Sequence, residues 1–148
     1  MTTVGMSRNN PFDIEPNHIA WLGEAARTSP VTFDTVEHGL RAGVLVFLAY
    51  ARAGLDTPRL AISTFAPPAD NPTAQYVADV CAWCGVKPDQ RVDFRDASFM
   101  VRWSRAVIRQ EQGAAEEASI SDAALVSAVG AAFAYESIPD GLGVAGAA

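Results

Sequence analysis

The sequence predicts a single, mainly α-helical domain of about five helices, with a small β-hairpin at most. At 148 residues, the chain is long enough for one domain that buries its own core. Apolar side chains recur at intervals of three and four along several segments, which is the period of an α-helix. Capping residues precede these segments and glycines end most of them, so the helix boundaries can be placed.

Residues 1–33 are predicted to form a loop and hairpin region that packs on the helical core. Three prolines interrupt this stretch, and no helical period is visible in it. The residues Val31–Phe33 favour a short strand because β-branched and aromatic side chains suit a pleated sheet. Trp21 and Leu22 are expected to anchor the region to the core.

The predicted helical core covers residues 34–135. Its first helix begins at Asp34, which together with Glu37 approximates a capping box, and it ends at Gly54. A short helix follows over residues 57–64, with a proline at its first helical position.

Three further helices complete the predicted core. The third helix is expected to be capped by Asn71 and to end at Gly85, and the fourth runs from Asp96 or Ser98 to Gly113. The fifth helix begins at Ser121 and consists mostly of small residues, which favours tight packing on another helix or on a second copy of the chain. Residues 136–148 are rich in glycine and alanine and are predicted to form a flexible tail.

Charge and composition exclude several classes of function. The net charge of −6 argues against general nucleic-acid binding, which needs clustered lysine and arginine. The longest apolar run, Ala42–Ala51, is too short to cross a bilayer, which takes roughly 20 residues. The sequence shows no positively charged stretch followed by an apolar run, which is the pattern of a secretory signal, so we expect synthesis in a host cytoplasm and no membrane insertion.

Cysteine and histidine give no sign of a metal or cofactor. Cys81 and Cys84 have no second cysteine pair, and His18 and His38 have no visible partners. We therefore expect a reduced, structural cysteine pair and no bound metal or cofactor.

Four short strings, taken together, resemble a known family. In their order and spacing they resemble bacteriophage virion proteins with a lysozyme-like, peptidoglycan-cutting fold. The chain departs from the family pattern at Phe12–Asp13 and at Gln112. The strings are Ser7–Pro11, Glu37–Ala42, Ala66–Tyr76 and Ala106–Gly113.

The same strings are similar, in a different order, to flagellar-type glucosaminidases and related lysozyme-like enzymes. Those enzymes place the catalytic glutamate helix first, whereas here it comes last, which suggests a circular permutation. The resemblance implies that Glu111 lies beside Asn9 and Asn10 and faces a groove formed by the N-terminal loop and Tyr76.

This resemblance assigns Glu111 the role of general acid and base. Glycoside cleavage needs a carboxylic acid with a raised pKa, and a helix C-terminus disfavours a nearby carboxylate. The alternative is a solvated glutamate at a helix end. A second carboxylate could come from any of four residues, among which the sequence does not choose, and a lytic transglycosylase needs only one acid/base group. The four are Asp13, Asp34, Glu37 and Asp70.

Neutral side chains are the predicted sugar ligands. The resemblance implies that Asn9, Asn10, Asn71 and Tyr76 bind hydroxyl and acetamido groups. Each has a structural alternative: the asparagine pair suits a tight turn before a proline, Asn71 suits a helix cap, and Tyr76 suits helix packing. Three arginines, Arg102, Arg105 and Arg109, form either a solvated helix face or a contact for an acidic partner.

The sequence thus predicts a phage protein, located in the virion, that degrades peptidoglycan during cell-wall penetration. Its expected partners are glycan strands, other virion proteins and a second copy of the chain. One alternative is a non-catalytic tail, baseplate or capsid component that keeps the lysozyme-like fold. Another is a free endolysin.

Overall fold

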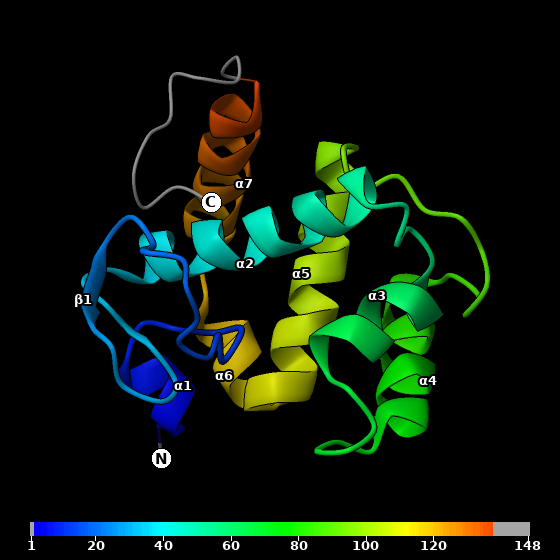
Figure 1. The fold of residues 1–148 in the computed structure, drawn as a ribbon, viewed down its shortest axis with the longest axis horizontal. Helices are drawn as coiled ribbons and strands as arrows, with labels where there is room; N and C mark the ends of the chain where they lie inside the picture. Colours follow the sequence, from blue (N-terminus) through cyan, green and yellow to red (C-terminus); the bar gives the residue numbers. More distant parts are fainter. Residues whose placement is uncertain (1, 138–148) are drawn as a thin grey trace.

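The computed structural model describes residues 2–137 and is mainly α-helical, with one small antiparallel sheet (Figure 1). This confirms the predicted fold class. The elements in chain order are α1 (Val4–Ser7), β1 (Glu24–Ala26), β2 (Thr32–Phe33), α2 (Val36–Arg52), α3 (Pro58–Phe65), α4 (Thr73–Cys84), α5 (Ala97–Gln112), α6 (Ala114–Ser119) and α7 (Asp122–Glu136).

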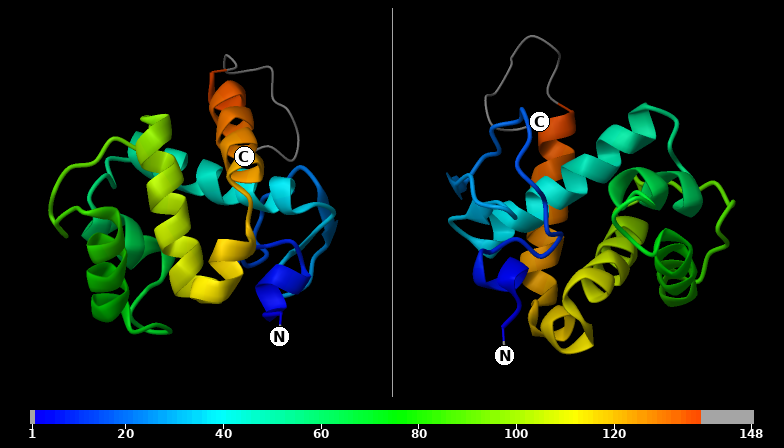
Figure 2. Two further views of the ribbon diagram at one scale, coloured as in Figure 1. Left: turned by 180° about the vertical axis from the view of Figure 1, so that it is seen from behind. Right: turned by 60° about the horizontal axis from the view of Figure 1, so that its bottom comes forward.

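Helix α2 runs across the middle of the molecule, from the β1–β2 hairpin at one end to the connection with α3 at the other (Figure 1). It packs most extensively on α7 and also contacts α5, while α3 and α4 pack together and α4 packs on α5. The N-terminal segment and the β1–β2 hairpin lie on the other side of the molecule from α3 and α4. In every view, α1 lies beside α6 and the end of α5 (Figure 2).

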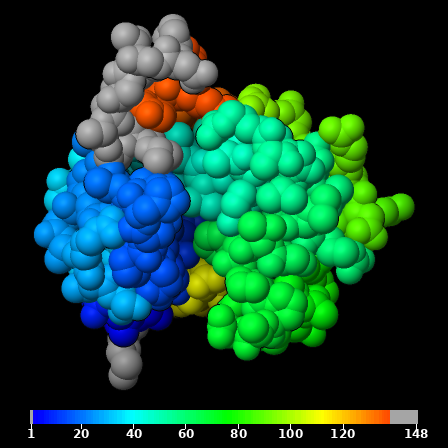
Figure 3. All heavy atoms as spheres, viewed as in Figure 1, coloured from blue at the N-terminus to red at the C-terminus, as the bar shows by residue number. Residues whose placement is uncertain are grey.

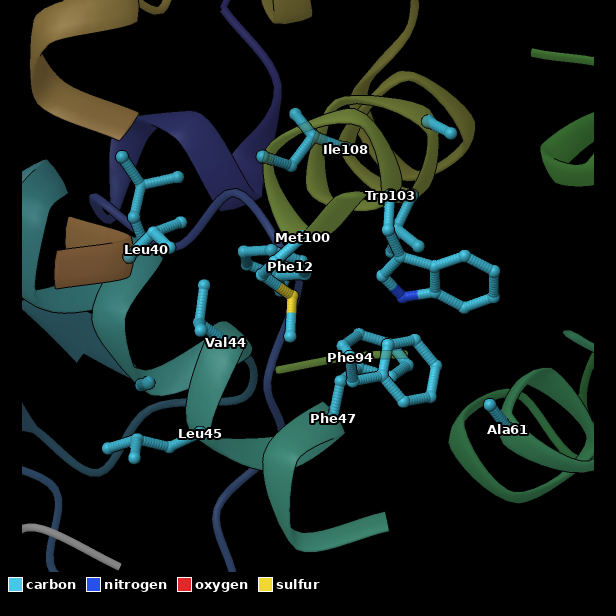
Figure 4. Packing of buried hydrophobic residues seen from close by; sticks show 14 of the residues in the cluster. Phe12, Leu40, Val44, Leu45, Phe47, Ala61, Phe94, Met100, Trp103 and Ile108 are labelled. Carbon is cyan, nitrogen blue, oxygen red and sulfur yellow. The ribbon is translucent and has the colours of Figure 1, made fainter. Parts of the chain in front are cut away.

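The core is built around an aromatic cluster contributed by α2, α5 and the α4–α5 connection. The ring of Phe47 lies 5.5 Å from Trp103 and 5.7 Å from Phe94, measured between centroids (Figure 4). All three side chains are fully buried. Phe12 from the N-terminal segment joins the cluster next to Phe47. The N-terminal segment therefore shares the core of the helices, which fixes its position.

Most helix boundaries follow the predicted signals. Asp96 caps α5 by accepting a hydrogen bond from the Phe99 amide at 3.0 Å, and Ser121 caps α7 in the same way. Gly85 ends α4 in the left-handed conformation, and Gly113 follows the last residue of α5. These agreements reflect local chemistry, in which a short side chain or a glycine satisfies unpaired backbone groups.

Two predicted caps are wrong. Thr35, not Asp34, caps α2 by accepting from the His38 amide at 3.2 Å, and Asp34 instead contacts the His38 ring. Asn71 does not cap α4, because its amide donates back to the Pro67 carbonyl at 3.1 Å. In both cases a competing polar contact takes the predicted capping side chain.

The predicted strand at Val31–Phe33 corresponds to β2, which pairs antiparallel with β1. Two short helices, α1 and α6, were not predicted, since segments of four and six residues carry no visible period. The predicted tail covers residues 136–148, but Glu136 is still part of α7, and the residues from 138 onward lie outside the described part of the chain. Within residues 2–137, no helix combines the length and the apolar character needed to cross a membrane.

Candidate active site

A groove of about 770 Å³ separates the N-terminal segment from the α3–α4 region. Figure 3 shows the surface hollowed between the N-terminal segment in blue and the region in green, with yellow atoms near residue 115 at its lower end. The groove is lined by Thr3, Val4, Gly5, Phe12, Asp13, Ile14, Glu15, Asn17, Pro30, Val46, Tyr50, Phe65, Ala66, Pro67, Asp70, Asn71, Glu111 and Gln112.

Glu111 reaches this groove from the last turn of α5. The Tyr76 hydroxyl, presented by α4, donates a hydrogen bond to Oε2 of Glu111 at 2.8 Å. Tyr76 is only 3% exposed, so this bond is shielded from water. It orients the Glu111 carboxyl and leaves its other oxygen available to a second group.

Asp13 supplies that second group from the N-terminal segment. Its carboxyl lies within hydrogen-bonding reach of the Glu111 carboxyl. The Asp13 backbone has φ of +52°, and its amide donates to the Asn10 carbonyl at 3.1 Å. Aspartate is one of the few residues that tolerate this left-handed conformation. A tight turn thus holds Asp13 against Glu111.

Gly5 makes room for this arrangement. A Cβ atom at this position would collide with the Asp13 carboxyl and with the side-chain amide of Gln112. Only a residue without a side chain allows α1 to approach the carboxyl pair this closely.

Burial and the neighbouring carboxyl raise the pKa of Glu111 to about 8, with the hydrogen bond from Tyr76 acting in the opposite direction. Burial and the nearby Glu111 carboxyl also raise the pKa of Tyr76 well above its usual range, so the phenol keeps its proton. A pKa of about 8 means that the Glu111 carboxyl is mostly protonated at neutral pH. The site therefore offers a protonated carboxylic acid to the groove.

Gln112 joins the end of α5 to the N-terminal segment. Its Nε2 donates to the Pro11 carbonyl at 3.0 Å, and its Oε1 accepts from the Thr3 hydroxyl. The predicted juxtaposition of the glutamate helix with the N-terminal asparagine turn is therefore present. Gln112, where the chain departs from the family pattern, is one of the residues that make it.

Asn9 and Asn10, two of the predicted sugar ligands, are not among the residues that line the groove. Asn10 is fully buried, and its side chain bonds the backbone of Ile14 and Val31 at 2.8 to 3.0 Å. Asn9 has φ of +54° and donates to the Phe33 carbonyl at 3.1 Å. Both side chains therefore hydrogen-bond to backbone and stabilise the turn that carries Asp13. This is the structural alternative to sugar binding that the sequence also allowed.

The α3–α4 loop forms the opposite rim of the groove, where Asn71 and Asp70 both line it. Of the four candidate second carboxylates, Asp13 and Asp70 thus reach the groove. Asp34 and Glu37 are exposed at the start of α2 and are absent from the lining.

Cys81 and Cys84 are buried, free thiols on α4. Burial raises the pKa of Cys84 to about 12, which keeps it protonated and unreactive. Among the described residues, no group of three or more histidine, cysteine or acidic side chains could hold a metal ion.

The three arginines of α5 lie outside the groove lining. Arg105 pairs with Glu117 at 2.7 Å and with Asp122 at 2.5 Å, tying α6 and α7 to α5. The guanidinium of Arg109 stacks over the Trp83 ring at 4.4 Å, and Arg102 lies over the ring of Phe99 at 5.5 Å.

The sequence does not single out two residues of the site. It leaves Asp13 as one of four candidate carboxylates, and it marks Gln112 only as a departure from the family pattern. One local signal favours Asp13, because an aspartate three residues after an asparagine turn suits a left-handed backbone. Nothing in the sequence indicates that Gln112 hydrogen-bonds to Pro11, which lies 101 residues away in the chain.

No protein-family profile matches the chain. The chain is similar to Protein P5 of Pseudoalteromonas phage PM2, with 30% identity over 96 residues. This match covers 60% of the chain and 60% of the relative's own length. The chain is thus similar to a bacteriophage protein over rather more than half of its length.

Proposed function

We propose that this protein is a bacteriophage virion component that cleaves peptidoglycan glycan strands during cell-wall penetration. One observation carries the proposal: a glutamate with a raised pKa stands at the floor of a groove, bonded to Tyr76 and facing Asp13. The similarity to a phage protein supports the virion setting. The lysozyme-like resemblance of the sequence supports glycan as the substrate.

The closeness of the two carboxyls favours a mechanism with one acid/base unit. Two-carboxylate glycosidases separate these groups by about 5–5.5 Å in retaining enzymes and about 6.5–9.5 Å in inverting enzymes. Asp13 and Glu111 are within hydrogen-bonding reach, which leaves no room for a sugar carbon or a water molecule between them. We therefore assign the chemistry to Glu111 and the tuning of its proton to Asp13.

In the proposed reaction, Glu111 donates its proton to the glycosidic oxygen as the bond from that oxygen to C1 breaks. The acetamido oxygen of the same sugar stabilises the positive charge at C1. The C6 hydroxyl of that sugar then attacks C1, and Glu111 takes up the hydroxyl proton. One product ends in a free hydroxyl and the other in a 1,6-anhydro sugar, and no water is consumed.

The test is clearing of purified peptidoglycan sacculi, followed by turbidity. The wild-type protein is expected to clear them, and Glu111→Gln is expected to lose at least about 100-fold in rate, the scale of a lost general acid. Glu37→Gln is the matched control, because Glu37 is exposed and lies outside the groove lining. It should clear sacculi at the wild-type rate.

Equal clearing by the wild type and by Glu111→Gln would remove Glu111 from the mechanism. No clearing by any form would leave the second candidate function, a structural virion protein without catalysis. That candidate is favoured by Asn9 and Asn10, which the family resemblance assigned to sugar binding and which here hold backbone instead. It predicts stoichiometric incorporation into virions whether or not Glu111 is replaced.

A further inference from the structure

The lining of the groove is acidic and neutral, without a basic side chain. Asp13, Glu15, Asp70 and Glu111 line it, whereas no lysine, arginine or histidine is among the described residues that do so. Asp70 and Glu15 are exposed on opposite rims. A bound molecule therefore meets negative charge from both sides.

Two arginines of the N-terminal region, Arg8 and Arg27, make contacts with other parts of the protein. Arg8 donates to the carbonyls of Ser29 and Pro30, at 2.6 and 3.0 Å. Arg27 pairs with Glu24 at 2.8 Å and bonds nearby backbone carbonyls. Neither arginine lines the groove, so the lining offers no basic group that could pair with a carboxylate of a ligand.

The groove is also lined by aromatic rings and by neutral polar side chains. Tyr50 and Phe65 are half-buried, line the groove and pack against Phe47, at 5.5 and 5.0 Å between ring centroids. Burial raises the pKa of Tyr50, so its hydroxyl stays neutral. Asn17 and Asn71 add amide groups. Rigid aromatic faces beside neutral amides and hydroxyls suit a sugar ring with acetamido groups.

Resting on the glycan-cleaving function proposed above, we infer that this groove selects glycan segments that are neutral or bear free amines. Segments that carry carboxylates, such as those with attached stem peptides, bind more weakly than neutral segments but are still bound. Like charges across a surface groove cost enough to weaken binding by about tenfold for each close pair. By the same argument, an ammonium group of a de-N-acetylated sugar should strengthen binding by about tenfold when it lies close to Asp70 or Glu15.

The experiment measures binding to the Glu111→Gln variant of the 148-residue chain, so that no turnover occurs. Binding is followed by calorimetry at low ionic strength. The three probes are chitotetraose, which is neutral, glucosamine tetramer, which is cationic, and tetragalacturonate, which is anionic. The first two are expected to bind, with tetragalacturonate at least about tenfold weaker than chitotetraose. Asp70→Asn should narrow this ratio, whereas Asp79→Asn, which makes the same change in net charge on α4 outside the groove lining, should leave it unchanged.

Equal binding of tetragalacturonate and chitotetraose would overturn the inference, and so would the absence of binding by all three. An equal effect of Asp70→Asn and Asp79→Asn would overturn it as well, because the selection would then come from net charge. The two experiments distinguish failure of this inference from failure of the proposed function. If Glu111→Gln binds the probes selectively but the wild-type protein does not clear sacculi, the charge selection is supported and the proposed catalysis is contradicted.

Discussion

At the scale of single residues, the pKa of Glu111 is set by two opposing effects. Burial and the facing Asp13 raise it, and the Tyr76 hydrogen bond lowers it. The left-handed backbone of Asp13 stores strain where the proposed chemistry occurs, a feature that recurs at functional sites.

Asp13→Asn tests the role of the second carboxyl. Asparagine tolerates the same backbone conformation, so the turn should persist. Loss of the facing charge lowers the pKa of Glu111, so the high-pH limb of the activity profile should move to lower pH. Glu15→Gln, an exposed change in the same groove, should leave that limb in place. An unchanged profile in Asp13→Asn would refute the pairing.

Replacing Glu111 should also change stability. Its pKa in the folded protein, about 8, lies above the ordinary 4.5, so the folded state binds this proton more tightly than the unfolded chain. The free energy of unfolding therefore falls as pH rises from about 4.5 through about 8. Glutamine does not ionise, so Glu111→Gln does not lose stability as the pH rises. Above about pH 8 its free energy of unfolding should exceed that of the wild type by on the order of 2 kcal/mol. Denaturant unfolding at low and high pH measures the difference, and equal stabilities at high pH would contradict a raised pKa.

At the scale of elements, the site depends on the junction between α5 and the N-terminal segment. Gln112 bonds Thr3 and Pro11, and Gly5 lets α1 approach. This junction places Asp13 opposite Glu111, so the geometry of the pair is set by contacts between the two parts of the chain.

Two substitutions on α5 separate positioning from stability. Gln112→Ala leaves the Pro11 carbonyl without its partner and should cost about 1–3 kcal/mol in unfolding free energy. Asp96→Ala removes the cap at the far end of the same helix and should cost about 1 kcal/mol. Only Gln112→Ala should shift the pH profile of clearing, because only it frees Asp13. The same shift in both variants would mean that helix stability alone governs the site.

Local signals explain how much of the fold and site the sequence could predict. Asp96, Ser121, Gly85 and Gly113 mark helix ends because each acts on its own neighbours in the chain. Thr35 displaced Asp34 as a cap because the His38 ring binds the aspartate, and such a choice depends on side-chain rotamers. The selection of Asp13 among four carboxylates depends on packing between distant segments, which no local pattern encodes.

At the scale of the whole molecule, two groups of elements flank a groove and share one core. The aromatic cluster around Phe47 joins α2, α5 and the N-terminal Phe12. The net charge of −6 gives the protein no attraction to an anionic cell wall, and the acidic groove adds to this. Specificity must therefore come from contacts within the groove.

This charge pattern predicts the response of clearing to salt. Both protein and sacculi are acidic, so added salt screens their repulsion. The initial rate of clearing should rise by about twofold between low and physiological ionic strength. A steep fall with salt, as a cationic wall-binding protein would show, would contradict the proposed mode of binding.

Mass spectrometry of the products from purified, peptide-free glycan strands tests cleavage by Glu111 at the level of the bond itself. The wild-type protein should release fragments that end in 1,6-anhydro sugars and lack one water relative to hydrolysed ends, and Glu111→Gln should release none. Intact strands after wild-type treatment, or the same fragments from Glu111→Gln, would contradict the assignment of Glu111 as the acid that cuts the strand.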